Sequence, residues 1–400
     1  MITCSIISCD PQKEPSSYHI IPVESSVGDY HILNLSDYAT NIRYIPLETD
    51  DSILMGEIEE MISYEHEKIV ISDAYHHCFL FDHNGTFCHQ IGSKGRGPNE
   101  YLLVVRMSMH NDLIFITDRY KLLIYDINGV AVDDIGLRSS DFPREYQIRH
   151  ILPLKKDLFV IDVVTWDNEY YPKAVLCESH QSHAKLIKEY PSYIKLDKSN
   201  SGFSFNETAI MYRFKDEIRT YKPINCDTLF TIGQDAEMDV AFIFDLGKYK
   251  PTLSFFEHNQ TGTYIVPVNI FESLNHLFIE FWFTPNHAPE PFTYMYSYTG
   301  SSWERTNNSV YGVFHKSTGK LILMQQPIKG KLGFKNDFDN GPVLWPHYIS
   351  SNNELVTHMS AEDFLDYVDK MEKPTPQMIE LSNRISVDDN PIVIIAKLKE

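Results

Sequence analysis

Three aspartates recur along the first half of the chain at nearly equal spacing. Asp73, Asp118 and Asp162 each lie at the end of a short apolar segment, and the steps between them are 118 − 73 = 45 and 162 − 118 = 44 residues. A carboxylate in this place either serves a functional site or accepts hydrogen bonds from the backbone of the next turn. We favour the second role, because the same residue recurs at the same strand end in successive repeats.

Side chains able to contact a ligand follow these aspartates and the glycine-rich connector between the first two repeats. In a four-stranded antiparallel unit, the loop after the second strand and the connector into the next unit lie at the same end, because strand direction alternates. We therefore expect rings and cations to meet on one face, at the mouth of a central channel. The predicted ligand-binding residues are Tyr75, His76, Arg96, Tyr101, Arg119, Tyr120, Trp166 and Trp282.

Three other segments suggest chemistry more weakly. His76-His77 looks like a metal pair, but adjacent strand residues point to opposite faces, so we predict no metal site. The segment from Gly92 to Gly97 lacks the spacing of a phosphate-binding loop and predicts a connector with positive φ. The aromatic residues of segment 284–308 either pack in the core or stack on sugar faces.

The repeats that carry these residues predict the fold. After each of the first two aspartates comes an aromatic strand and an Asn-Gly turn, at Asn84-Gly85 and Asn128-Gly129. A period of about 40 to 45 residues built from short strands is typical of β-propeller blades. Later strands at 217–221, 277–281 and 355–358 bring the number of units to six. We therefore predict an all-β fold, a six-bladed β-propeller of four-stranded antiparallel blades.

The end of the chain predicts how the ring closes. Ser360 and Thr375-Pro376 begin two short helices in the last blade, and residues 391–398 form an apolar strand. An unpaired apolar strand at a terminus would be an aggregation-prone edge. We expect it to pair with the strand at 42–47, which joins the two ends of the chain.

Composition excludes several classes of partner. The chain has 400 residues, 35 of them basic and 55 acidic, for a net charge of −20. This balance does not suit nucleic acid, whose binding needs many cations. No apolar run of about 18 residues is present to span a membrane. The six cysteines lack the spacing of a zinc site, and those beyond the first ten residues are expected to be buried thiols. We expect a monomer.

The first residues resemble a bacterial lipobox. Ile6-Ile7-Ser8 precedes Cys9, and a polar run follows, although no Lys or Arg precedes the cysteine. We predict lipidation at Cys9, a signal remnant and polar tether over residues 1–30, and the propeller over residues 31–400. Contact with the membrane would then be through the lipid anchor alone.

Five motifs in order resemble the Bacteroides-type six-bladed β-propeller lipoproteins, with NHL-repeat-like and TolB-like character. They are Tyr44-Ile45-Pro46-Leu47-Glu48-Thr49, the connector from Ile91 to Tyr101, Asp227-Thr228-Leu229-Phe230, the segment from Phe334 to Gly341, and Asn390-Pro391-Ile392-Val393. The resemblance implies a propeller in the bacterial cell envelope, on the periplasmic side or the cell surface. After the third repeat the sequence departs from the NHL pattern.

Two functions are compatible with these observations. The first is an envelope-tethered module that binds a small ligand, a glycan or a protein partner on its loop face, without catalysis or cofactor. The alternative is a metal-dependent hydrolase or lactonase with calcium in the central channel. The oxygens for that ion would come from Glu59, Glu60, Asn206, Asn269 and Glu272.

Overall fold

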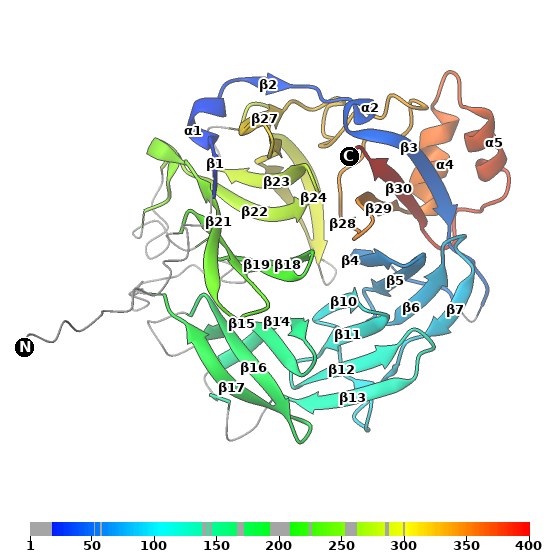
Figure 1. The fold of residues 1–400 in the computed structure, drawn as a ribbon. Coiled ribbons are helices and arrows are strands. Elements are labelled where there is room, and N and C mark those ends of the chain that lie inside the picture. The colour runs from blue at the N-terminus through cyan, green and yellow to red at the C-terminus, as the bar shows by residue number, and fades with distance from the viewer. Residues whose placement is uncertain are drawn as a thin grey trace, which may run out of the picture.

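A computed structural model describes most of the chain. The described residues are 18–51, 53–56, 58–137, 142–143, 146–165, 172–192, 209–223, 226–252, 262–284, 288–298 and 301–400. They form an all-β structure with a few short helices. Small antiparallel sheets stand around a common axis in a propeller-like arrangement (Figure 1).

The first two units match the predicted repeats. They consist of β4 (Ile58–Glu65), β5 (Lys68–Asp73), β6 (Cys78–Asp82) and β7 (Phe87–Gln90), followed by β10 (Arg106–His110), β11 (Leu113–Thr117), β12 (Lys121–Asp126) and β13 (Ala131–Gly136). Each is an antiparallel meander in which neighbouring strands pair in chain order. The connector between them carries the short parallel pair β8 (Ser93–Lys94) and β9 (Glu100–Tyr101).

The middle of the chain continues the pattern with longer strands. These are β14 (Tyr146–Lys155), β15 (Leu158–Thr165), β16 (Ala174–His180), β17 (His183–Tyr190), β18 (Ile210–Phe214), β19 (Glu217–Tyr221), β20 (Thr228–Ile232) and β21 (Met238–Phe244). A single parallel bridge between Gly136 and His183 joins β13 to β17. The strands from β10 to β17 therefore form one sheet of eight strands.

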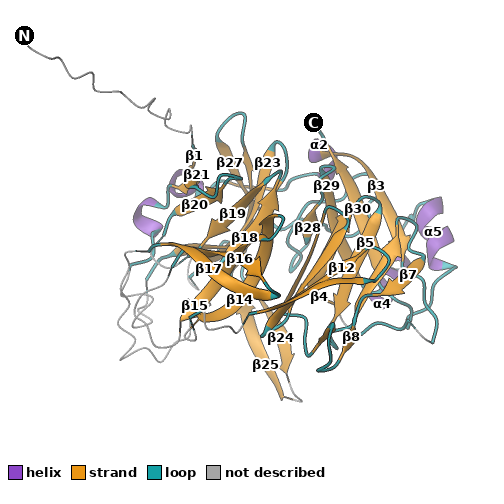
Figure 2. Cartoon of the chain, turned by 60° about the horizontal axis from the view of Figure 1, so that its bottom comes forward, coloured by secondary structure: helices purple, strands orange, loops and turns teal. Residues whose placement is uncertain are grey.

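The remaining sheets include the helices and a projecting hairpin. One sheet contains β22 (Ile265–Glu272), β23 (His276–Phe283), β26 (Ser309–His315) and β27 (Lys320–Met324), and the last contains β28 (Tyr348–Ile349), β29 (Glu354–Met359), β30 (Ile392–Leu398) and β3 (Ala39–Pro46). The predicted helices α4 (Ala361–Asp369) and α5 (Pro376–Ser382) lie between β29 and β30, and the Ser360 hydroxyl accepts the Asp363 N–H as an N-cap. β24 (Phe292–Tyr298) and β25 (Ser301–Asn307) form a separate hairpin that projects from one end of the ring (Figure 2).

The prediction of six separate four-stranded blades is not confirmed. Among the described residues, two sheets have four strands, two have five and one has eight. The extra strands come from β1 (His19–Ile21), parallel to β21, and β2 (Tyr30–His31), parallel to β27. Unpaired outer strands expose backbone N–H and C=O groups, and these short segments cover them. Residues 19–21 and 30–31 thus lie on the outer edges of two sheets. All of them except His31 had been assigned to the tether.

The N-terminal helices α1 (Val23–Ser26) and α2 (Leu35–Tyr38) connect these edge strands to β3, and a 3₁₀ turn (η1, Gly247–Tyr249) follows β21. The Glu24 N–H donates to the Asp245 carbonyl, which fixes α1 beside this turn. The inner side of the ring is made by the first strand of each meander. The strands β4, β10, β14, β18, β22 and β28 contact one another in this order, and β28 contacts β4 again.

The two ends of the chain close the ring, as predicted. β3 pairs antiparallel with β30, with Ile42 opposite Ala396 and Tyr44 opposite Ile394. The strand is buried on both faces: Ile392 and Ile394 pack into the core of the last unit, while Val393 and Ile395 pack into the core of the first.

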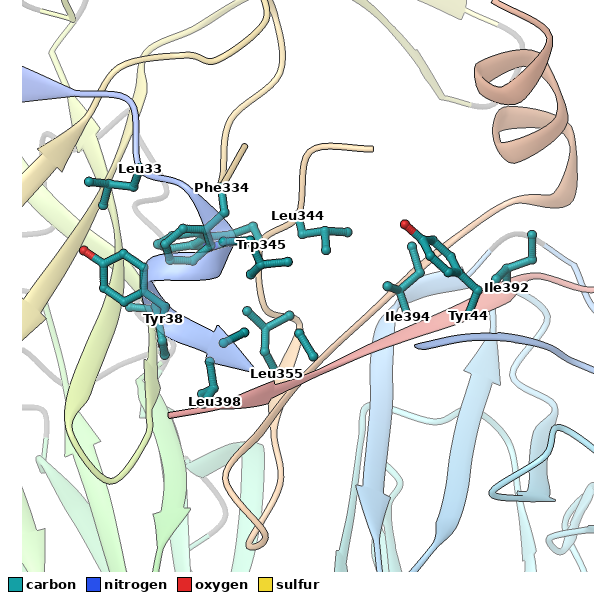
Figure 3. Packing of buried hydrophobic residues seen from close by; sticks show 14 of the residues in the cluster. Leu33, Tyr38, Tyr44, Phe334, Leu344, Trp345, Leu355, Ile392, Ile394 and Leu398 are labelled. Atoms are coloured by element: carbon teal, nitrogen blue, oxygen red, sulfur yellow. The ribbon is translucent and has the colours of Figure 1, made fainter. Parts of the chain in front are cut away.

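Aromatic residues complete the core of the last unit. Figure 3 shows Tyr44 beside Ile392 and Ile394 where β3 meets β30, with Phe334 and Trp345 in the same cluster. The Phe334 and Trp345 rings stack with centroids 5.7 Å apart. This cluster covers one face of the closing strand, so the closure depends on apolar burial as well as on the backbone ladder.

Deletion of residues 391–400 should open the ring. Five Ile, Val and Leu side chains of β30 are at most 1% exposed, and at about 2 kcal/mol each their loss costs about 10 kcal/mol, which is comparable to the whole stability of a domain. Thermal unfolding should show that the cooperative transition is lost, and light scattering should show that the protein self-associates. Deletion of the exposed Glu400 alone is the control. An unchanged melting temperature and monomeric state of the longer deletion would disprove closure.

Candidate functional site

One end of the ring carries the predicted ligand-binding loops. We call it the connector face and define it by loops 74–77 and 119–120, connector 92–101 and the hairpin β24–β25. The first two loops follow β5 and β11, and the hairpin follows β23, so all three come after the second strand of their meander. Such loops lie at the same end as the connectors, and Figure 2 shows β8 and the hairpin at the same end.

Asp73 holds the first loop of this face. Its side chain is fully buried, and its Oδ1 accepts the N–H groups of Tyr75 at 3.0 Å and His77 at 2.8 Å. Oδ2 accepts the Gly56 N–H at 3.1 Å and lies 3.1 Å from Nδ1 of His77. A single carboxylate therefore ties the loop to the segment that leads into β4, which is the structural role we favoured.

Asp118 and Asp162 act in the same way. Asp118 accepts the N–H of Leu102 at 2.7 Å and that of Arg119. Asp162 accepts the Ala209 N–H at 2.8 Å and forms a buried ion pair with Lys222 at 3.0 Å. Each aspartate thus links a second strand to a connector, and none is free to act on a ligand.

Two tyrosines are displayed alike above these aspartates. Tyr75 and Tyr120 each follow their aspartate by two residues and are 65% and 39% exposed. Arg96 and Arg119 are exposed on the same face. The Tyr75 ring lies over Gly56, where a Cβ atom would come within 2.6 Å of it. The connector face therefore offers exposed rings and guanidinium groups on loops fixed by buried hydrogen bonds.

Not every predicted residue is available to a ligand. Tyr101 is fully buried and donates its hydroxyl proton to the Ile91 carbonyl at 3.1 Å, so its assignment to the ligand-binding set was wrong. His76 is half-buried with φ of 65°, and Trp282 is half-buried in β23. Trp166 and Cys9 lie outside the described residues.

The glycine-rich connector is occupied by one of its own side chains. The Glu100 carboxylate accepts the Gly97 N–H at 2.7 Å, and a Cβ atom on Gly95 would lie 1.9 Å from its Oε2. Gly92 has φ of 63°, as predicted, whereas Gly95 and Gly97 have no positive φ and are needed for the close approach of Glu100. The Glu100 carboxylate occupies the position that a bound anion would take in a phosphate-binding loop. We therefore interpret the segment as a structural connector.

The residues proposed for a calcium site do not assemble. Glu272 is buried, and its carboxylate accepts hydrogen bonds from Arg219 Nε at 3.0 Å, Tyr212 at 3.0 Å and Lys316 at 2.7 Å. The Asn269 side chain accepts the Ile270 N–H. Asn206 and the side chains of Glu59 and Glu60 lie outside the described part of the chain. Within that part, no group of three or more His, Cys, Asp or Glu side chains is placed to hold a metal ion.

Sequence reasoning missed a second group of polar residues. The inner strands β10, β14 and β18 carry Arg106, Arg149 and Arg213, none of which was in the predicted set. The signal was present in the sequence, because segments 106–110, 146–155 and 210–214 contain no Asp or Glu although the chain is strongly acidic. It could be recognised only once these segments were known to be neighbours.

Comparison with known proteins places the chain in a family. The sequence pattern of the Domain of unknown function DUF4934 matches residues 18–397. The chain belongs to the DUF4934 family. No curated protein matches the sequence. Within the described residues, no helix is long and apolar enough to cross a membrane.

One of the similar solved structures supports the fold. A protein of Bacteroides fragilis NCTC 9343 described as exported is 18% identical with a TM-score of 0.68, over 95% of this chain and 100% of that one. A protein from Lactobacillus plantarum is 8% identical with a TM-score of 0.37, over 72% and 95%. The extracellular domain of a B. thetaiotaomicron hybrid two-component system is 12% identical with a TM-score of 0.35, over 79% and 38%. These comparisons do not confirm an NHL-like or TolB-like family.

Replacement of Asp73 by Ala should destabilise the protein. The change leaves the partly buried N–H groups of Gly56, Tyr75 and His77 without their acceptor, which costs about 3 kcal/mol in the free energy of unfolding. Denaturant unfolding measures this loss. Asp388→Ala, at an exposed position, is the control and should change the same quantity by less than about 0.5 kcal/mol. Equal stability of the two variants would refute the role of Asp73.

His358 on β29 makes stability depend on pH. Burial lowers the pKa of His358 to about 3, and the nearby His347 adds to this shift. Below pH 6.5, the ordinary pKa of histidine, the unfolded chain binds a proton at His358 that the folded chain does not. The contribution of neutral His358 to the free energy of unfolding is therefore complete above pH 6.5 and is lost as the pH falls toward 3. In denaturant unfolding at pH 7, 6 and 5, His358→Gln should therefore show a shallower decline than the unmodified protein. Parallel declines would contradict this assignment.

Proposed function

We propose that this protein is a binding module of the bacterial envelope that contacts its ligand, a glycan or a protein partner, through the connector face. The observation that carries the proposal is the repeated display of Tyr75 and Tyr120, each two residues beyond a buried aspartate. Tyrosine supplies a large contact area with little loss of side-chain entropy, and its ring stacks on sugars or on other side chains. Because the loops are already ordered, binding has little further ordering cost.

Charge and shape add to this surface. Arg96 and Arg119 can donate paired hydrogen bonds to carboxylate groups of a ligand. The hairpin β24–β25 stands at the same end, and Tyr294 on β24 is 42% exposed. The hairpin would form a rim beside the loops and contact one side of an elongated ligand.

We propose further that the ring has six blades. The eight-stranded sheet is then counted as two blades joined by one bridge. Export is supported by the structural similarity to the Bacteroides fragilis protein, which is described as exported. Lipidation at Cys9 would then hold the propeller at the membrane surface.

The described residues do not favour the metal-dependent alternative. Glu272, the carboxylate of that set whose side chain the structure describes, is already neutralised by Arg219 and Lys316. A metal ion at this place would have to compete with two fixed cations. No other observation favours hydrolysis.

The binding proposal is tested with the full chain on arrays of glycans and envelope proteins. A ligand found in this way should bind the Tyr75→Ala, Tyr120→Ala double variant at least about tenfold more weakly, equivalent to about 1.4 kcal/mol. Tyr18→Ala is the matched control, because Tyr18 is 50% exposed next to the edge strand β1. If every ligand binds the double variant as well as the control, the connector face is not the binding surface.

A further inference from the structure

The inner wall of the ring has an unusual charge distribution. The strands β10, β14 and β18, neighbours on the inner side, contribute cationic or ionisable nitrogen side chains and no carboxylate, although the chain has a net charge of −20. Burying a cation without an anion is costly, so those members of the set whose charged atoms are buried call for a negative partner. The buried carboxylates Glu65 on β4 and Glu272 on β22, two other inner strands, already accept hydrogen bonds from other groups of the chain. The side chains of the set are Arg106, His110, Arg149, His150, Lys155 and Arg213, of which Arg106 and Lys155 are exposed.

Arg213 lies close to the axis. Burial lowers the pKa of His110 to about 4, and Arg213 contributes to this shift. Burial also lowers the pKa of Arg213, while Asp216 and Tyr348 oppose the change. His110 is on β10 and Tyr348 on β28, and each of these strands is separated from β18 by one inner strand. A side chain that interacts with both must extend into the centre of the ring.

The guanidinium group of Arg213 lacks a hydrogen-bond acceptor. Its Nη1 and Nη2 are buried and have no partner among the described residues, and the same holds for Nε of Arg149. Asp216 is near, but no ion pair joins it to Arg213 in the described part of the chain. The Tyr348 hydroxyl donates to Glu65 at 2.7 Å.

The next strand shows how this fold treats a buried arginine that has a structural role. Arg219 on β19 donates from Nε to Glu272 at 3.0 Å and from Nη1 to Glu217 at 2.6 Å. Its charge is matched by two carboxylates of the chain itself. Arg213 has the same chemical requirement, but its Nη1 and Nη2 are in hydrogen-bond contact with no carboxylate of the described residues, which points to an acceptor supplied from outside the chain.

We propose that Arg213 binds a small anion, a carboxylate or phosphate group, on the axis of the ring. The planar fork of the guanidinium group matches either group through two parallel hydrogen bonds. Arg149, on the neighbouring strand β14, sits at a register shift between Ile148 and His150 and is a second unpaired donor of the wall, nearer the connector end of its strand than Arg213 is of β18. Bulges of this kind redirect a side chain.

This anion site is separate from the connector face. The inner strands run from the connectors to the turns at the opposite end. Arg213 is the penultimate residue of β18, and His110 is the last residue of β10. The site therefore lies toward the end of the axis away from Tyr75 and Tyr120. Loss of ligand binding at the connector face would leave it unaffected.

Thermal unfolding of the full chain in sodium phosphate, sodium acetate and sodium chloride at equal ionic strength tests the proposal. A ligand that binds only the folded state raises the melting temperature in a saturable way. Phosphate or acetate should do so relative to chloride, and the larger rise identifies the preferred group. The Arg213→Gln variant should lose the rise, whereas Arg384→Gln, which removes an exposed arginine on another part of the fold, should keep it.

A second readout separates binding from a structural role. In chloride alone, Arg213→Gln should be at least as stable as the unmodified protein, because the change removes an uncompensated buried charge. Arg213→Lys keeps the charge but not the fork, and should retain at most part of the rise. The proposal is overturned if neither anion gives a saturable rise, or if Arg213→Gln keeps the full rise.

Discussion

The antiparallel ladder between β3 and β30 is the interaction on which the rest of the structure depends. A meander of four strands is a weak unit by itself, because it has two open edges and two apolar faces. In a ring each face is covered by a neighbour, but only if the last unit meets the first. Pairing Tyr44 with Ile394 achieves this, since alternate residues of β30 then enter the cores of both units.

Closure has a direct consequence for the connector face and for the axis. Once the inner strands are held in a closed ring, the second strands end at one level, and Asp73 and Asp118 can each fasten a loop to a connector. The same ring brings Arg213, His110 and Tyr348 from three different units toward a common centre. The rigid part of the protein is therefore built from local repeats, and the binding surfaces arise where the repeats end.

Much of this could be predicted from local sequence signals. The strand at 217–221, the N-cap Ser360 and the pairing of the terminal strand all follow from alternation, capping and edge protection, and the structure confirms them. The structural role of Asp73 and Asp118 was also interpreted correctly, because a carboxylate at a strand end has few structural alternatives. Asp162 departs from the prediction: it lies within β15 and binds Ala209 and Lys222, which are distant in sequence.

The remaining features depend on contacts between distant segments. Tyr101 looks like a loop aromatic in sequence but enters the core between the first two units. The edge strand at 19–21 has three residues and no turn signal, so nothing local reveals its pairing with β21. The bridge between Gly136 and His183, which merges two meanders into one sheet, is likewise invisible in the sequence. The proposed role of Arg213 depends on β10 and β28, which lie two places away around the ring and are distant in sequence.

The central claim, that the ring is held together by its two chain ends, is tested most directly by amide hydrogen exchange resolved along the sequence. If the claim holds, the amides of Ile394 and Ile395 in β30 exchange as slowly as those of the central strand β11, through global unfolding. Exchange in β30 at the rate of the exposed loop 74–77, while β11 stays protected, would show that the ends of the chain separate without unfolding the ring, and would contradict the account.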